Sequence, residues 1–144
     1  MELNFESCVK KGRLVKIKPD LELAGAELKE AEADLTSAKE EIKKQSWKWA
    51  VEKAYYTMFH AARALLLQKG LKERRSHRCL ILGLKELYIK TGLISRKYLD
   101  YIETAKFRRE DAIYASRYSK EIAITHGRNA EDFLNVAKDF MEIS

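Results

Sequence analysis

The chain has 144 residues, of which 46% are hydrophobic and 35% are charged. This composition is typical of one folded domain with a charged surface, and it excludes collagen-like, mucin-like and disordered-linker proteins. Lysine and arginine number 28 against 22 acidic residues, which gives a formal charge of +6 and favours an anionic partner without identifying one.

Membrane, secretion and metal signals are missing from the sequence. The longest apolar runs, such as 64–67, are far shorter than the roughly 20 residues of a membrane span, and the N-terminus has no apolar signal segment, so we expect a cytoplasmic protein. Cys8 and Cys79 are too few and too far apart to predict a disulfide framework, and the three histidines lack metal-ligand spacing. We therefore expect no metal and no cofactor.

The first 18 residues are weakly periodic and predict a mostly irregular N-terminal arm with at most one helical turn and a short alternating segment at 14–18. Pro19 is the only proline, so the rest of the chain is predicted to be helical and a sheet is not expected. Between Asp20 and Lys44 an apolar seam at three-and-four spacing predicts the first helix. This helix carries a net charge of −4, which leaves +10 for the other elements.

The second predicted helix, 47–69, begins after Ser46 and ends at Gly70. It is apolar around most of its circumference, and a second copy of the chain would bury the remaining face, so we expect a homodimer. Three further helices are predicted from near Ser76 to Thr91, from Ser95 onward, and from a cap at Thr125 or Asn129. The predicted fold is a single all-α domain over 1–144, an up-and-down bundle of antiparallel helices.

Three groups of polar residues are candidates for ligand binding, and two of them also have a structural interpretation. His60 and Arg63 share a helix face, where the cation favours a neutral imidazole, but such pairs are more often a half-buried boundary. A basic connection spans Lys69 to Arg78 and is suited to salt-sensitive nucleic-acid binding. At the end of the fourth predicted helix the arginines suit phosphate binding, but they are also typical of a solvent-exposed helix C-terminus. The basic candidates of the last two groups include Arg74, Arg75, Arg108 and Arg109.

A family resemblance rests on the order of several short motifs. They are Lys18-Pro19-Asp20, Trp49-Ala50-Val51, the string from Ala54 to Leu66 (AYYTMFHAARALL), Gly70, Thr91-Gly92-Leu93 and the arginine-rich end with Tyr114. Over residues 14 to 142 the chain resembles HEPN-domain proteins, in particular small single-domain prokaryotic and archaeal members. The resemblance implies a four-helix bundle with an extra short helix, a homodimer, and pairing with a minimal nucleotidyltransferase in toxin–antitoxin modules.

Active relatives, as the resemblance implies, are metal-independent endoribonucleases with an arginine followed after four to six residues by a histidine. At that spacing from Arg108 the chain has Ile113 and Tyr114, and no histidine follows at the same spacing from Arg109. Isoleucine cannot transfer a proton, and an ordinary tyrosine is a poor base at neutral pH. Proton transfer would therefore fall to Tyr114, Asp111 or a distant histidine such as His126.

The sequence therefore predicts binding of RNA or a nucleotide in a basic dimer cleft, with two alternatives for chemistry. In the first, the protein is an endoribonuclease in which Arg108 or Arg109 stabilises the charge on the attacked phosphate. In the second, the motif is degenerate and the protein is a non-catalytic binding or scaffold module.

Overall fold

The computed structural model describes residues 3–110 and 118–143. The α-helices are α1 (Phe5–Lys10), α2 (Leu21–Lys43), α3 (Trp47–Gln68), α4 (His77–Leu84), α5 (Arg96–Glu110) and α6 (Lys120–Ile143). Two short strands, β1 (Leu14–Lys16) and β2 (Leu71–Glu73), accompany the helices, and a π-helical segment, η1 (Lys85–Ile89), continues directly from helix α4. The predicted all-α class is confirmed apart from the two strands.

Helices α2 and α3 begin and end close to the predicted residues. At the start of α2, the Oδ1 atom of Asp20 accepts a hydrogen bond of 2.9 Å from the backbone N–H of Leu23. Gly70 follows α3 with a φ angle of +77°, and a Cβ atom at this position would lie 2.5 Å from the carbonyl oxygen of Ile17. Only glycine fits both the left-handed conformation and this close approach, which explains why α3 stops here.

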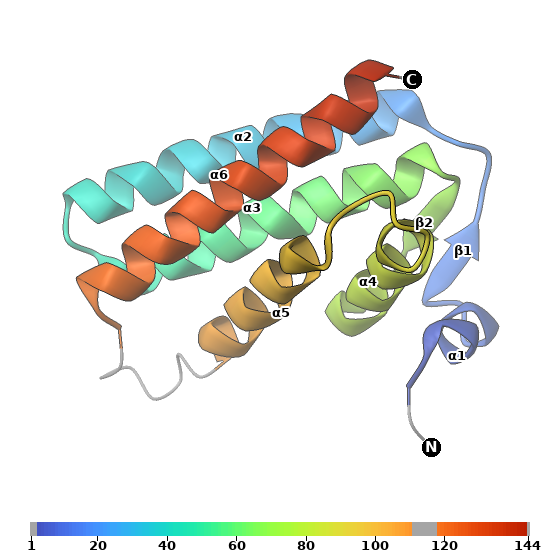
Figure 1. Ribbon diagram of the computed structural model, residues 1–144, viewed down its shortest axis with the longest axis horizontal. Helices are drawn as coiled ribbons and strands as arrows, with labels where there is room; N and C mark the ends of the chain where they lie inside the picture. Colours follow the sequence, from blue (N-terminus) through green and yellow to red (C-terminus); the bar gives the residue numbers. More distant parts are fainter. Residues whose placement is uncertain (1–2, 111–117, 144) are drawn as a thin grey trace.

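Helix α3 lies at the centre of the molecule (Figure 1). It packs against α2 and α6, and it also contacts the shorter helices α4 and α5. Side chains such as Tyr55, Met58 and Leu65 are almost completely buried within one chain. The apolar circumference of this helix therefore has an intrachain explanation, so it no longer argues for a dimer, and the homodimer stays a prediction.

The sheet is the first feature that corrects the sequence analysis. Strand β1 pairs antiparallel with β2, and Leu14 lies opposite Glu73. The alternating segment at 14–18 was the only local signal for β1, and three-residue strands are too short for periodicity to reveal them.

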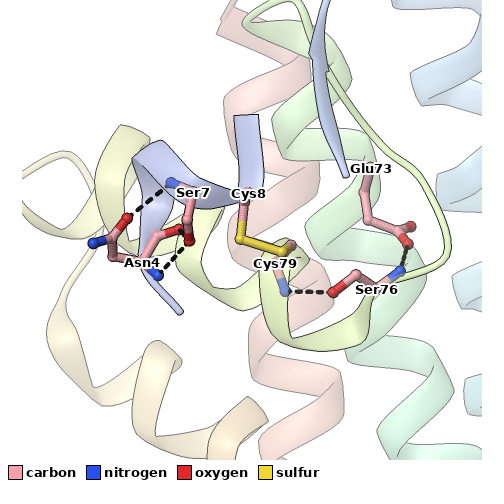
Figure 2. Close-up of a disulfide and its surroundings, with 6 residues drawn as sticks. All are labelled: Asn4, Ser7, Cys8, Glu73, Ser76 and Cys79. Atoms are coloured by element: carbon pink, nitrogen blue, oxygen red, sulfur yellow. Dashed lines mark hydrogen bonds between the residues drawn. A yellow bond between two sulfur atoms is a disulfide. The ribbon is translucent and has the colours of Figure 1, made fainter. Parts of the chain in front are cut away.

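A disulfide between Cys8 and Cys79 is the second correction (Figure 2). The two Cα atoms are 5.7 Å apart although 71 positions separate the residues in sequence. The bond ties α1 to α4, and α1 itself is a regular helix that starts with a reciprocal cap between Asn4 and Ser7. The two cysteines can pair despite their distance in sequence, because the β1–β2 sheet holds the N-terminal arm next to the start of α4.

Helix α6 begins earlier than predicted. The Oγ atom of Ser119 accepts a hydrogen bond of 3.2 Å from the backbone N–H of Ile122, so the helix begins at Lys120 rather than after Thr125 or Asn129. The helix opens with Lys120 and Glu121, and the apolar stripe used for the prediction began only at Ala130. In the part of the chain that the structure describes, none of the helices combines the length and the apolar character needed to span a bilayer.

Candidate anion-binding site

Arg109 lies in the last turn of α5 and reaches across to α3. Its Nε atom donates to Oε1 of Glu52 at 3.1 Å, and its Nη2 atom donates to the hydroxyl of Tyr56 at 2.9 Å. The guanidinium carbon lies 5.3 Å from the ring centroid of Tyr55 and 5.1 Å from that of Tyr56. Two hydrogen bonds and two cation–π contacts therefore fix the orientation of a side chain that is still 27% exposed.

His77, the first residue of α4, contacts the same aromatic side chains. Its Nδ1 atom is 2.7 Å from the hydroxyl of Tyr55, and its ring centroid is 4.3 Å from that of Phe59. Burial lowers the pKa of His77, and the charge of Arg109 lowers it further. The imidazole is therefore neutral at pH 7.

We call the group of Glu52, Tyr55, Tyr56, His77 and Arg109 the Arg109 cluster. A guanidinium has five N–H donors, and two of those of Arg109 are used by Glu52 and Tyr56, so three have no hydrogen-bond partner among the described residues. Since His77 and Arg109 are both only partly buried, the cluster offers N–H donors to a ligand next to an aromatic surface. Glu52 offsets part of the positive charge.

His60 and Arg63, which were predicted to bind a ligand, pair with acidic side chains instead. Nδ1 of His60 is 2.6 Å from a carboxylate oxygen of Glu27, and its Nε2 is 3.6 Å from one of Asp34. Arg63 donates from Nε to Glu73 at 2.8 Å. The sequence argument considered only Arg63 as a neighbour of the imidazole and missed both carboxylates of α2. These contacts tie α3 to α2 and β2.

Arg108 faces another part of the molecule. It lines a cavity of about 280 Å³ between α5 and α6, together with Thr104, Thr125 and His126. His126 is only 4% exposed, and its Nδ1 atom is buried without a hydrogen-bond partner among the described residues. Burial, and to a lesser extent the charge of Arg108, lowers the pKa of His126 to about 4. Arg108 thus lies near His126, whereas Arg109 and His77 contact the same tyrosine, Tyr55.

The other basic candidates form a third surface. Arg74 and Arg75 line a concavity of about 320 Å³ with Lys11 and Arg13 of the N-terminal arm. Arg75 has a φ angle of +54°, in the left-handed region that non-glycine residues rarely adopt.

The remaining candidates, Asp111, Ile113 and Tyr114, lie outside the described residues. Within 3–110 and 118–143, no group of three His, Cys, Asp or Glu side chains is arranged to hold a metal ion.

His77 is the functional candidate that the sequence analysis missed. It lies 32 residues before Arg109, outside any spacing that the motif considers. The available signal was indirect: His77 directly follows Ser76, whose side chain caps α4 and thereby fixes the position of the first helical residue.

Comparison with known proteins decides the family. The sequence pattern of the HEPN domain matches residues 25–144. The chain belongs to the HEPN domain family. The expected resemblance is confirmed, and the helical architecture of this HEPN protein agrees with it.

Three archaeal relatives are similar to this HEPN protein. A UPF0332 protein of Archaeoglobus fulgidus is 33% identical over 78% of the chain and 90% of its own length. A UPF0332 protein of Pyrococcus horikoshii is 36% identical over 52% of the chain, and the match spans only 52% of that relative. A Methanocaldococcus jannaschii protein named as a putative toxin is 28% identical over 79% of the chain and 78% of its own length.

Proposed function

We propose that this HEPN domain binds RNA through a backbone phosphate at the Arg109 cluster, as part of a toxin–antitoxin-like module. The observation that carries the proposal is the fixed guanidinium of Arg109, which keeps three N–H donors without a partner among the described residues. A planar guanidinium matches two phosphate oxygens at once, and the ring of Tyr56 adds a surface on which an unpaired base can stack. The name of the Methanocaldococcus relative supports the toxin-like context.

The basic surface around Arg74 and Arg75 extends the proposed RNA footprint. Together with Lys11 and Arg13 it places four cationic side chains around one concavity. Contacts of this kind recognise the backbone charge rather than the base sequence, and their affinity falls steeply with salt.

A homodimer and a nucleotidyltransferase partner belong to the same proposal. Trp49 of α3 is 52% exposed and Phe107 of α5 is 62% exposed, so two of the three helices that supply the Arg109 cluster also present a large apolar side chain to solvent. A second copy of the chain is the proposed cover for these side chains. The nucleotidyltransferase follows from the family resemblance alone.

RNA cleavage is a second candidate function, and one observation favours it. His77 contacts Tyr55, the ring that Arg109 also contacts, and so adds an imidazole N–H to the phosphate-binding arginine although the sequence motif lacks a histidine. In cleavage, the 2′-hydroxyl would give its proton to water and its oxygen would bond to the adjacent phosphorus, while the bond to the 5′-oxygen breaks and that oxygen takes up a proton from water. The products would be a 2′,3′-cyclic phosphate and a 5′-hydroxyl, and Arg109 would stabilise the charge on the phosphate. Ile113, in place of the motif histidine, favours the alternative of a non-catalytic binding module.

Binding and cleavage can be separated in one experiment. Single-stranded RNA is incubated in chelator with the parent, with Arg109→Ala, with Arg109→Lys and with the matched control Arg128→Ala, which removes an exposed cation from α6. We expect Arg109→Ala to weaken RNA binding by about tenfold to a hundredfold, because a charged hydrogen-bonding contact is lost. Arg109→Lys should recover only part of the affinity, since lysine lacks the planar fork.

Whether the parent chain cleaves the RNA decides between a ribonuclease and a binding module. Products from the parent chain support a metal-independent ribonuclease, whereas binding without products supports a non-catalytic module. Equal RNA affinity of the parent and both Arg109 variants, with folding verified by thermal unfolding, would refute the proposed site.

A further inference from the structure

The hydrogen bond between Tyr55 and His77 determines which imidazole nitrogen carries the proton. Tyr55 is fully buried, and burial raises the pKa of its hydroxyl, so the phenol keeps its proton. Among the described residues, Nδ1 of His77 is the only hydrogen-bond partner of that hydroxyl, at 2.7 Å. A buried hydroxyl hydrogen without an acceptor is costly, so Tyr55 is the donor and Nδ1 is the acceptor. In the neutral ring the proton is then on Nε2.

The Nε2–H group of His77 is available to a ligand. His77 is partly exposed, and its Nε2 atom has no hydrogen-bond partner among the described residues. Among these residues, the buried side-chain polar atoms that lack a partner do not include Nε2 of His77, so this atom is accessible to solvent. Tyr55 also contacts the guanidinium of Arg109, so one buried phenol lies against both donors. The charged groups that act on the ring are Arg63, Glu73, Lys106 and Arg109.

We propose that His77, held by Tyr55 in the Nε2–H form, is the second hydrogen-bond donor of the phosphate site, next to Arg109. This inference rests on the proposed RNA binding at the Arg109 cluster. A phosphate bound there receives a charged, forked contact from α5 and a neutral contact from the start of α4. Two donors on different helices fix the orientation of the phosphate, which a single arginine does not.

The same geometry argues against His77 as the general base of a cleavage reaction. A base needs a lone pair directed toward the substrate, but in this tautomer the lone pair on Nδ1 is occupied by the hydroxyl of Tyr55. Tyr55 is therefore a positioning residue, and His77 is a phosphate ligand.

The tautomer can be measured directly. Nitrogen-15 NMR of the full chain at pH 7.5 is expected to show a protonated Nε2 and an unprotonated Nδ1 for His77, and Tyr55→Phe should give a mixture of the two forms. A parent protein with the proton on Nδ1 would overturn the inference.

Affinity measurements test the phosphate contact. For single-stranded RNA we expect His77→Ala to lower the affinity about threefold to tenfold, the range of a neutral hydrogen bond. His77→Gln, which keeps an N–H group, should retain most of the affinity, and Tyr55→Phe should fall between the two. Tyr98→Phe is the matched control, because the hydroxyl of Tyr98 bonds Asp132 of α6 instead.

Salt dependence separates this inference from the proposed function. Arg109→Ala should reduce the slope of log affinity against log salt by about 1, whereas His77→Ala should leave the slope unchanged because the lost contact is neutral. If Arg109→Ala weakens binding and His77→Ala does not, only the role of His77 fails. If neither variant changes the affinity, the proposed RNA site itself fails.

Discussion

Arg108 and Arg109 are neighbours in sequence but lie in different chemical surroundings. Arg109 is fixed by Glu52 and Tyr56 and lies close to the hydrogen-bonded His77. Arg108 borders a cavity whose buried histidine, His126, has an Nδ1 atom with no partner among the described residues. Successive residues of an α-helix point about 100° apart, so a single turn of α5 serves both surroundings.

The two sides of α5 differ in how their polar groups are paired. On the Arg109 side, every donor that is used has a fixed partner and the remaining donors are accessible. On the other side, the imidazole of His126 is buried and its Nδ1 atom has no hydrogen-bond partner among the described residues, and burial of an unpaired polar atom costs stability.

The disulfide should affect the Arg109 side most strongly, because Cys79 lies two residues after His77 on α4. Reduction, or the double variant Cys8→Ala with Cys79→Ala, is expected to lower the free energy of unfolding by about 4 kcal/mol, the loop-entropy value for a link across 71 residues. Urea denaturation measures the loss. Unchanged stability would show that the bond does not constrain the unfolded chain.

Acid should lower the free energy of unfolding through protonation of His126. The pKa of His126 is about 4 in the folded protein against 6.5 in the unfolded chain, so the unfolded state binds the proton first as the pH falls. The free energy of unfolding is therefore unaffected by His126 protonation above pH 6.5, and it falls by roughly 3 kcal/mol as the pH drops from 6.5 to 4.

His126→Leu is the control for this pH dependence. Carboxylates and His77 also titrate in the acid range, so the difference between parent and variant isolates His126. We expect a shallower decrease of the free energy of unfolding in the variant, measured by urea denaturation at several pH values. Parallel curves for the two proteins would contradict the buried neutral state of His126.

The smallest expected effect concerns the carboxylate that holds Arg109. Glu52→Gln keeps a hydrogen-bond acceptor but removes a negative charge from the Arg109 cluster, so RNA affinity should rise about twofold to fivefold, in the range of a partly exposed ion pair. Glu131→Gln, which removes the carboxylate that pairs with Lys39, is the matched control. A lower affinity for Glu52→Gln would show that the carboxylate serves mainly to orient the guanidinium.

The sequence predicted the features that local rules determine. The start of α4 at Ser76 and the stop at Gly70 follow from short-range chemistry, and the structure confirms them. Ser46 directly precedes α3 as predicted, but its side chain makes no capping hydrogen bond. The β1–β2 pairing and the disulfide depend on contacts between residues more than 50 positions apart, which no local pattern reports.

The candidate site was predictable only in part. Arg109 was identified from its chemistry, but its partners on α3 and α4 are brought near by tertiary packing. His60 carried the stronger sequence signal, yet it lies between two carboxylates of α2, whereas His77, without a motif, lies beside the arginine.

The position of bound RNA can be followed in the unmodified protein by nitrogen-15 NMR of its arginine and histidine side chains during titration with single-stranded RNA. If RNA binds at the Arg109 cluster, the signals of Arg109 and His77 shift together while those of Arg108 and His126 stay in place. Shifts confined to Arg108 and His126 would place the RNA in the α5–α6 cavity and refute binding at the Arg109 cluster.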